Sequence, residues 1–179
     1  MRQGYSSVTM TDIIEETGIS RGGIYLYFRS VDEIFAQVIR DYDAERLEAI
    51  RTAVKQGGEF SLLLDTFFDN RKNALLQREH SLRRAMYEFF LCHGQDACQH
   101  HYAEQLKNKT AILTEILRCG CIHGDVPEQL SSTVALALEG MGTVTLMQDV
   151  DPDTLDRQLA YLKQLIVCEL AERNGVLRL

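Results

Sequence analysis

Three helix-start signals lie within the first 33 residues, and they constrain the local fold more than any other feature of the chain. Thr9, Ser20 and Ser30 carry hydroxyls that can cap helix N-termini, and an acid follows three residues after the first and the third. Gly18 stands where a left-handed residue would end a helix. The pattern predicts two short helices, followed by a long helix from Ser30 to the glycine pair at 57–58.

The rest of the chain favours helices as well. Apolar residues recur at helical spacing, the chain has only two prolines, and no run alternates as a strand would. These patterns predict an all-α fold. The expected later helices cover about 60–79, 81–93, 96–119, 130–148 and 153–173, the last with Asp151 as its cap and Pro152 at its first position.

Composition narrows the class of protein. With 179 residues, 45% of them hydrophobic, the chain can bury one large core or two small ones. The N-terminus has no apolar stretch of signal-peptide length, and the longest aliphatic run, 134–138, is too short to cross a bilayer. Five cysteines, an odd number, indicate reduced thiols. We therefore expect a cytoplasmic protein without a membrane partner.

The net charge of −7 excludes proteins that hold nucleic acid by bulk charge alone. Binding to DNA would need a local geometry, and residues 9–28 offer one. Two short helices joined by a tight turn form the helix-turn-helix pattern, in which the second helix enters the major groove. Small residues at Gly22 and Gly23 would let the backbone approach DNA, and Arg21 would be the long donor to a guanine edge or a phosphate.

Other side chains of this segment suit phosphate contacts. The phenols of Tyr25 and Tyr27 can donate hydrogen bonds to phosphate oxygens, and so can the hydroxyls of Thr9 and Thr11 beside the free N–H groups of a helix start. The alternative is a glycine loop that enters a helix whose aromatic residues serve the core. The expected DNA-binding residues are Thr9, Thr11, Ser20, Arg21, Gly22, Gly23, Tyr25, Tyr27 and Arg29.

The run GYSSVTMTDIIEETGISRGGIYLYFRSVDEIF, residues 4–35, closely resembles the DNA-binding signature of the tetracycline-repressor (TetR) family of bacterial transcriptional regulators. The resemblance covers Gly4 to about Val38. It implies a helix-turn-helix domain over 1–47 and a helical effector-binding and dimerisation domain over 48–179. It also implies a homodimeric repressor that binds double-stranded operator DNA and is released from it by a small effector.

Two departures from the family pattern stand out. The family normally has a helix before the Gly4-Tyr5 pair, and only residues 1–3 stand there, so we expect the first helix of the domain to be missing from this sequence. Val31 occupies a position that often carries lysine in the family, which would remove a phosphate contact. Residues 1–30 are neutral, with three arginines and three acids.

Aromatic residues in the second half suggest an effector pocket. A helical cavity rich in rings suits a planar or apolar small molecule. Glu88 and His93 could add polar anchors, and a partly buried acid would favour a cationic ligand; ordinary core packing is the alternative. The expected ligand-binding residues are Phe67, Phe68, Met86, Tyr87, Phe90, His93, Tyr102, Leu106 and Met147.

Two apolar stripes suggest a dimer interface in the last two helices. A partner would explain helices that are apolar on more than one side, and Gly140 and Gly142 would permit close helix approach. The alternative is that both stripes belong to the core. The expected interface residues are Val134, Leu138, Met141, Thr145, Leu155, Leu159, Leu162, Ile166 and Leu170.

Cysteines and histidines at 92–101 and 119–123 support a rival hypothesis, a metal- or thiol-redox-responsive regulator. Cys98 and Cys119 are 21 residues apart, about 30 Å along a continuous helix, so the two groups cannot form one site within a protomer. Neither group has a known zinc spacing. We therefore assign no metal and no cofactor.

Sequence motifs of enzymes are missing: the chain has no Gly-x-Ser-x-Gly elbow, no phosphate-binding glycine loop and no His-Glu-x-x-His. A cysteine–histidine nucleophile remains open, because its partners need not be close in sequence. A plain helical interaction protein also remains open, although it leaves the three capped helices unexplained. We do not expect an enzyme.

Overall fold

The helices expected from the sequence are all present. The computed structural model describes residues 4–77, 81–93, 95–121 and 128–175, without the side chains of residues 95–98 and 101. Within these residues the chain is all-α, with no strand. The elements are η1 (Tyr5–Ser7, a short 3-10 helix), α1 (Met10–Thr17), α2 (Arg21–Tyr27), α3 (Val31–Lys55), α4 (Phe60–Leu76), α5 (Leu82–Cys92), α6 (Gln95–Gly120), α7 (Glu128–Met147) and α8 (Pro152–Arg173).

Capping hydrogen bonds explain where the first helices begin. The Thr9 hydroxyl accepts from the backbone N–H of Asp12 at 3.2 Å, and the Asp12 carboxylate accepts from the backbone N–H of Thr9 at 2.8 Å. Ser20 caps α2 in the same way, accepting from Gly23 at 3.1 Å. Gly18 ends α1 with a φ of 68°, a conformation that favours glycine. The predicted short helices and their turn are confirmed.

The capping box predicted at the start of α3 forms only in part. Ser30 accepts from the backbone N–H of Glu33 at 3.2 Å, as expected. The Glu33 carboxylate instead accepts from the backbone N–H of Arg29, at 2.6 Å. Glu33 thus fixes the backbone of Arg29, in the short link between α2 and α3.

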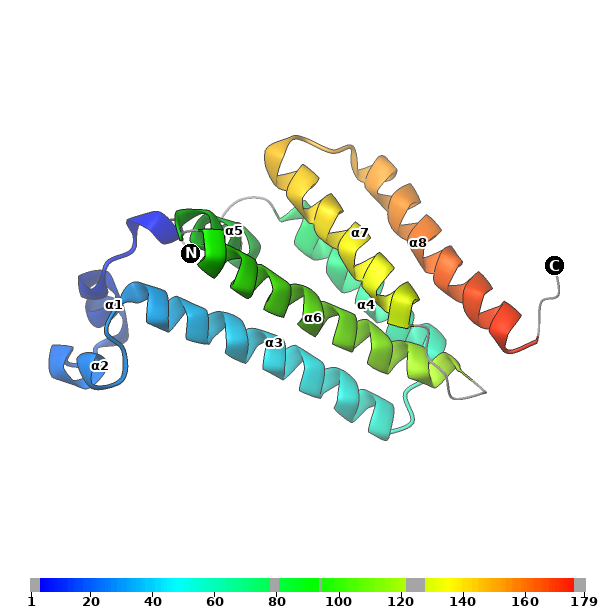
Figure 1. Ribbon diagram of the computed structural model, residues 1–179, viewed down its shortest axis with the longest axis horizontal. Helices are drawn as coiled ribbons and strands as arrows, with labels where there is room; N and C mark the ends of the chain where they lie inside the picture. Colours follow the sequence, from blue (N-terminus) through cyan, green and yellow to red (C-terminus); the bar gives the residue numbers. More distant parts are fainter. Residues whose placement is uncertain (1–3, 78–80, 94, 122–127, 176–179) are drawn as a thin grey trace.

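Helix α3 connects the two ends of an elongated molecule. Its 25 residues span about 37 Å. Figure 1 shows α1 and α2 at one end of the molecule, beside the start of α3. Helices α4, α6, α7 and α8 form the helical body, which lies beside α3 and extends toward the other end of the molecule. Helix α6 packs on both α3 and α7, and α4 packs on α6, α7 and α8. Helix α6 is therefore central to the body.

Two separate clusters of buried side chains hold these parts together. The body cluster centres on α6, where Leu113, Ile116 and Leu117 are fully buried against α4, α7 and α8. The second cluster, the joint cluster, connects η1 and the first turns of α3 to α5 and consists of Tyr5, Phe35, Ile39, Ala85, Met86, Phe89 and Phe90. In it the Tyr5 ring lies 4.8 Å from the ring of Phe35 and 5.2 Å from that of Phe89.

The stripes expected to form a dimer interface mostly face the core of the protomer, so this prediction needs correction. Met141 and Leu162 are partly buried and pack against the body cluster. The other seven residues are at most 5% exposed and cannot contact a partner: Val134, Leu138, Thr145, Leu155, Leu159, Ile166 and Leu170. Helical spacing identifies an apolar stripe but does not say whether the same chain or a second copy covers it.

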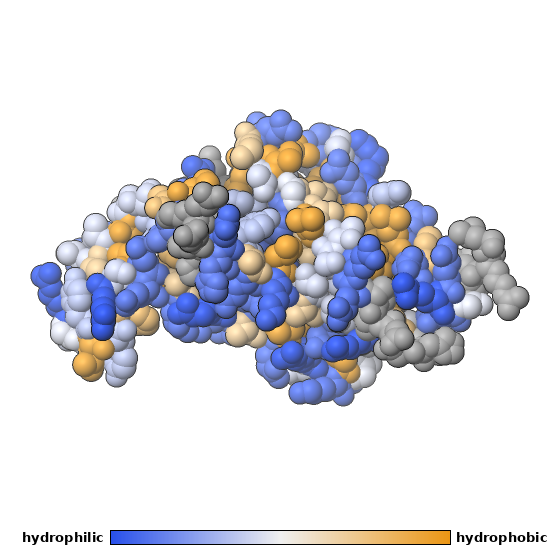
Figure 2. Space-filling view, in the orientation of Figure 1, coloured by the Kyte–Doolittle hydropathy of each residue, from blue (hydrophilic) through white to orange (hydrophobic). Residues whose placement is uncertain are grey.

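The opposite faces of α7 and α8 carry apolar side chains that remain exposed. Figure 2 shows apolar residues gathered over these two helices, interrupted by polar ones. The exposed large apolar or aromatic side chains of the two helices are Leu136, Val144 and Met147 on α7, and Tyr161, Leu165 and Val167 on α8.

By length and composition, α7 could cross a membrane. Its buried residues, however, include Val134 and Leu138, which belong to the body cluster, and Glu139, which is ion-paired inside the protein. The apolar composition of α7 therefore reflects its position in the core, packed between α4 and α6.

Candidate functional site

The residues expected to contact DNA lie together at the α1–α2 end. Helix α1 begins at Met10 and α2 at Arg21, with a tight turn at Gly18 between them. Both helices lie at one end of the molecule (Figure 1). Gly23 is half-buried. The other eight expected residues are exposed: Thr9, Thr11, Ser20, Arg21, Gly22, Tyr25, Tyr27 and Arg29.

The two glycines of α2 differ in their surroundings. A Cβ atom on Gly22 would meet nothing within 4 Å, so this position opens to solvent on the exposed side of the helix. A Cβ on Gly23 would lie 3.2 Å from both Ile19 Cγ2 and Ser20 Oγ. Gly22 alone therefore suits a close approach of another molecule to the backbone, whereas Gly23 allows tight packing of the turn.

The first turn of α2 holds its arginine in place. The guanidinium of Arg21 lies 5.6 Å from the centre of the Tyr25 ring, within the range of a cation–π contact. Tyr27 is 76% exposed and presents its phenol to solvent. Arginine and phenol together can contact base edges and phosphates.

Two exposed apolar residues lie at this end that the sequence analysis did not include among the DNA-binding residues. Leu26 is 77% exposed and Ile19 is 51% exposed. A signal for them existed, because a seven-residue helix with Ile24, Tyr25, Leu26 and Tyr27 in succession can bury only one side. In the structure only Ile24 of these is buried. An exposed Leu26 can contact the methyl group of thymine.

The expectation for Thr9 needs correction. Its hydroxyl donates to the Asp12 carboxylate at 2.7 Å while it accepts from the Asp12 backbone. The hydroxyl hydrogen is therefore already used within the capping box. Thr11 remains exposed and can still donate to a phosphate.

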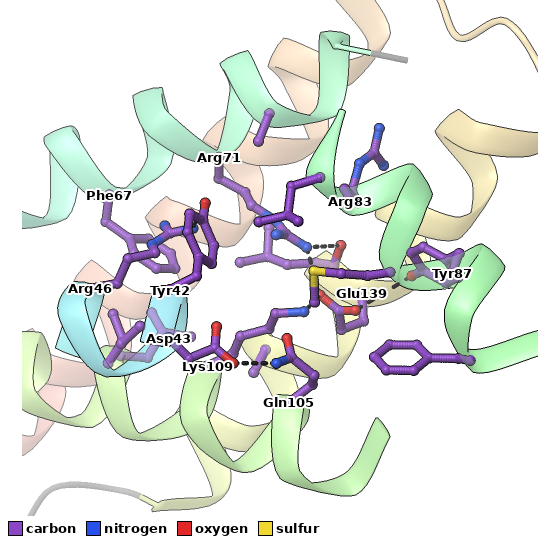
Figure 3. Close-up of a pocket in the computed structure, with 18 residues that line it drawn as sticks. Tyr42, Asp43, Arg46, Phe67, Arg71, Arg83, Tyr87, Gln105, Lys109 and Glu139 are labelled. Carbon is purple, nitrogen blue, oxygen red and sulfur yellow. Dashed lines mark hydrogen bonds and ion pairs between the residues drawn. The ribbon is translucent and has the colours of Figure 1, made fainter. Parts of the chain in front are cut away.

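A cavity of about 80 Å³ lies inside the helical body and receives side chains from α3 to α7 (Figure 3). Four of the nine expected ligand-binding residues line it: Phe67, Met86, Tyr87 and Phe90. The complete lining is Tyr42, Asp43, Arg46, Phe67, Arg71, Ala74, Leu82, Arg83, Met86, Tyr87, Phe90, Gln105, Lys109, Ile112, Leu113, Ala135, Leu138 and Glu139.

The other five expected residues do not line this cavity. Phe68 is buried in the body cluster, because its neighbour Phe67 takes the cavity side of α4. Leu106 packs against the body cluster and Tyr102 against the joint cluster. His93 forms an ion pair with a carboxylate of α3. Met147 is 80% exposed at the end of α7.

A buried acid holds two cations inside the cavity. Glu139 Oε1 accepts from Lys109 Nζ at 2.7 Å and from Arg71 Nη2 at 2.8 Å, as the dashed lines of Figure 3 show in part. The Tyr87 hydroxyl donates to Glu139 Oε2 at 3.4 Å. Although burial opposes ionisation, Lys109 and Arg71 hold the pKa of Glu139 below its usual value. This ionic cluster joins α4, α6 and α7.

A second acid links the cavity to α3. Asp43 is buried and accepts hydrogen bonds from Gln105 and Asn108, both on α6. Burial raises the pKa of Asp43. Next to it, Arg46 donates to the Tyr42 hydroxyl at 3.0 Å. The middle of α3 thus forms one wall of the cavity.

The charged residues of the cavity were not singled out in the sequence. A signal was present at two positions. Asp43 lies four residues after Ile39 and four before Leu47, on the apolar side of its helix. Glu139 directly follows the longest aliphatic run, 134–138. A charge on an apolar face needs a partner, and here the partners are other helices.

The cysteines and histidines do not assemble into a site within the described part of the chain. No group of three or more metal-binding side chains is found there. Cys92 is exposed, whereas burial raises the pKa of the Cys119 and Cys121 thiols and so disfavours reactive thiolates. The side chains of Cys98 and His101, and all of His123, lie outside the described residues.

Comparisons with known proteins agree with the α1–α2 geometry. Residues 1–38 match the family described as bacterial regulatory proteins, tetR family. The chain is also similar to YfiR of Bacillus subtilis (strain 168), an uncharacterized HTH-type transcriptional regulator, with 27% identity over 136 residues. That match covers 75% of this chain and 66% of the relative, so it spans just under two thirds of the relative's length.

Proposed function

Because the chain belongs to the tetR family of bacterial regulatory proteins, we propose that it is a cytoplasmic repressor and not an enzyme. In this proposal a homodimer binds operator DNA and leaves it when a small molecule occupies the cavity. The observation that carries the proposal is the course of α3. Its first turns pack into the joint cluster beside α1 and α2, and its middle lines the cavity.

The proposed DNA contact is made by α2 in the major groove. Arg21 and Tyr27 would contact base edges or phosphates, and Leu26 would contact a thymine methyl. The residues described up to Ser30 include two arginines against three acids, so attraction by bulk charge does not support binding. Affinity would therefore come from the shape of this end and a few well-placed donors.

The proposed dimer uses the exposed faces of α7 and α8. Leu136, Val144 and Met147 lie at helical spacing with Gly140, beside which a Cβ would meet open space. Tyr161 and Leu165 continue the apolar surface on α8. An isologous contact there would give the dimer twofold symmetry and let its two α2 helices meet successive major grooves about 34–36 Å apart.

The proposed signal passes from the cavity along α3. Ligand pockets are commonly about 300–1,000 Å³, and the cavity here is about 80 Å³, so an effector of ordinary size must displace side chains. Asp43 on α3 is tied to α6, so a displacement of α6 would move α3. A dimer whose α2 helices are no longer spaced for DNA would then be favoured.

Selection from a pool of random duplexes would test the DNA-binding part of the proposal. The chain should enrich a palindromic sequence. Arg21→Ala should weaken binding to that sequence and flatten its salt dependence by a log–log slope of about 0.9 if a phosphate contact is lost. Arg118→Ala is the matched control, because Arg118 is exposed at the far end of α6. A pool without enrichment would contradict the proposal, as would equal losses in both variants.

A further inference from the structure

We propose that the cavity binds an organic anion, namely a small carboxylate with an apolar body. The inference rests on the proposed function in taking this cavity for the effector site, and it names the chemical class of the effector. It differs from the expectation that a buried acid would select a cationic ligand.

The charges around the cavity are unequal. Four cationic side chains line it, one from each of four helices: Arg46 of α3, Arg71 of α4, Arg83 of α5 and Lys109 of α6. Only two acids face them, Asp43 and Glu139. Burial raises the pKa of Asp43, which weakens it as a counter-charge, and burial also lowers the pKa of Lys109. The Arg83 guanidinium donates to the Gly142 carbonyl at 2.6 Å and to the Thr145 hydroxyl at 2.8 Å. Arg46 and Arg71 still outnumber the ionised Glu139, so a cationic ligand would meet an excess of positive charge.

Glu139 is shared between two cations. Its Oε1 atom accepts from both Arg71 and Lys109, so one oxygen serves two donors. The Arg71 Nε atom is buried and has no hydrogen-bond partner among the described residues. Nη2 of the same guanidinium already donates to the Leu138 carbonyl and to Glu139 Oε1. A ligand carboxylate could therefore accept from Nε and, by displacing Glu139, from Nη2, the two-bond geometry that arginine offers to carboxylates.

The remaining walls fit an apolar body. Phe67, Met86, Phe90 and Leu113 line the same cavity as the cations. In Figure 3 the Arg71, Lys109 and Glu139 side chains meet in the middle, with Phe67 at one side and Tyr87 at the other. A molecule with a carboxylate at this centre would place its apolar part against the rings.

Binding would also act on the helices. Arg71 connects α4 to α7 through Glu139 and through the Leu138 carbonyl, at 2.9 Å. A ligand carboxylate that takes one of the two donors from Glu139 would weaken the contact of α7 with α4 or α6. The site is therefore placed to convert charge recognition into a helix shift.

Calorimetric titration with three matched probes tests the charge preference. The probes are 3-phenylpropionate, its primary amide and 3-phenylpropylamine, with octanoate as a second carboxylate. The affinity for 3-phenylpropionate should be at least about tenfold higher than the affinity for the amide or the amine. Arg71→Met should weaken carboxylate binding by about tenfold, while Arg118→Met, which removes one charge outside the cavity, should leave it unchanged. No binding of either carboxylate at millimolar concentration overturns the inference.

Glu139→Gln gives a test of opposite sign. It removes the negative charge that Arg71 and Lys109 share, so carboxylate binding should tighten, whereas a site for cations would lose affinity for the amine. Circular dichroism confirms that each variant is folded, and Arg71→Met keeps the test decisive if Glu139→Gln does not fold. The inference is wrong if the amine binds best or if Glu139→Gln weakens carboxylate binding.

Binding is measured without DNA, so the two proposals can fail separately. Carboxylate binding that leaves DNA affinity unchanged supports the ligand class and contradicts the release mechanism. DNA enrichment without any carboxylate binding contradicts the ligand class alone.

Discussion

At the scale of single residues, the adjacent glycines of α2 form a natural matched pair. A methyl group on Gly22 meets open space, whereas one on Gly23 meets Ile19 and Ser20 at 3.2 Å. Gly22→Ala should therefore raise the free energy of unfolding by about 0.5–1 kcal/mol, the usual gain of alanine over glycine in a helix. Gly23→Ala should not raise the free energy of unfolding, because the added methyl group would crowd Ile19 and Ser20. Denaturant titration of both variants measures the difference.

The same pair separates stability from DNA binding. If α2 approaches DNA through its bare first turn, Gly22→Ala should bind the selected duplex more weakly although the protein is more stable. A Gly22→Ala variant with unchanged DNA affinity would show that this glycine does not face DNA.

His93 offers a test by pH. Its Nε2 lies 3.0 Å from Asp32 Oδ2, and its Nδ1 lies 2.6 Å from the Phe89 carbonyl. Burial lowers the pKa of His93, but the hydrogen bonds to Phe89 and Asp32 raise it overall, above 6.5. The Tyr5 hydroxyl donates to Asp32 and lowers the pKa of that acid below 3.8, against the effect of its burial.

The signs of these shifts define a window. A raised histidine pKa gives stability that is complete below pH 6.5 and is lost as the pH rises through the raised value. A lowered aspartate pKa gives stability that is present above pH 3.8 and is lost on acidification. Thermal unfolding should show a stability contribution that is present between pH 3.8 and pH 6.5 and declines as the pH rises further. His93→Gln should flatten the decline; an identical pH profile would contradict the ion pair.

At the scale of elements, the sequence predicted every α-helix of the described residues, and a local cap marks the start of several of them, although α4 begins without a side-chain cap. Thr9, Ser20, Ser30 and Asp151 all cap helices in the structure. The faces of these helices were harder to predict. The stripe through Leu138 and Leu159 is apolar whether the same chain or a partner covers it, and only the packing decides. Local pattern could place Glu139 next to an apolar run, but it could not identify the partners of this acid, because they lie on helices far apart in sequence.

The cap of α3 can be tested directly. Ser30 accepts the Glu33 N–H where a long helix begins, so Ser30→Ala should lower the free energy of unfolding by about 1 kcal/mol. Ser132 is the control. It is exposed within α7, and its hydroxyl donates to the Gln129 carbonyl, so Ser132→Ala should change stability by less than about 0.5 kcal/mol. Equal effects in urea titrations would argue against the capping role.

At the scale of the whole molecule, the proposed function requires a dimer. Each α2 helix would read one half-site, and a second copy would have to be held at a fixed distance for a palindrome to be recognised. Tyr161 is 63% exposed on α8, in the apolar surface proposed as the interface. Because its side chain is largely outside the core, Tyr161→Glu should leave the protomer folded.

Leu62 provides the matched control, since it is also 63% exposed but lies on α4. In a dimer through α7 and α8, Tyr161→Glu would bury an unpaired carboxylate, at a cost of several kcal/mol, whereas Leu62→Glu would keep its charge in water. Sedimentation at micromolar concentration should show a dimer for the parent and for Leu62→Glu, and a monomer for Tyr161→Glu. The monomer should also lose affinity for the palindrome. A monomeric parent, or a dimer that only Leu62→Glu dissociates, would place the partner elsewhere and remove the basis for paired recognition of DNA.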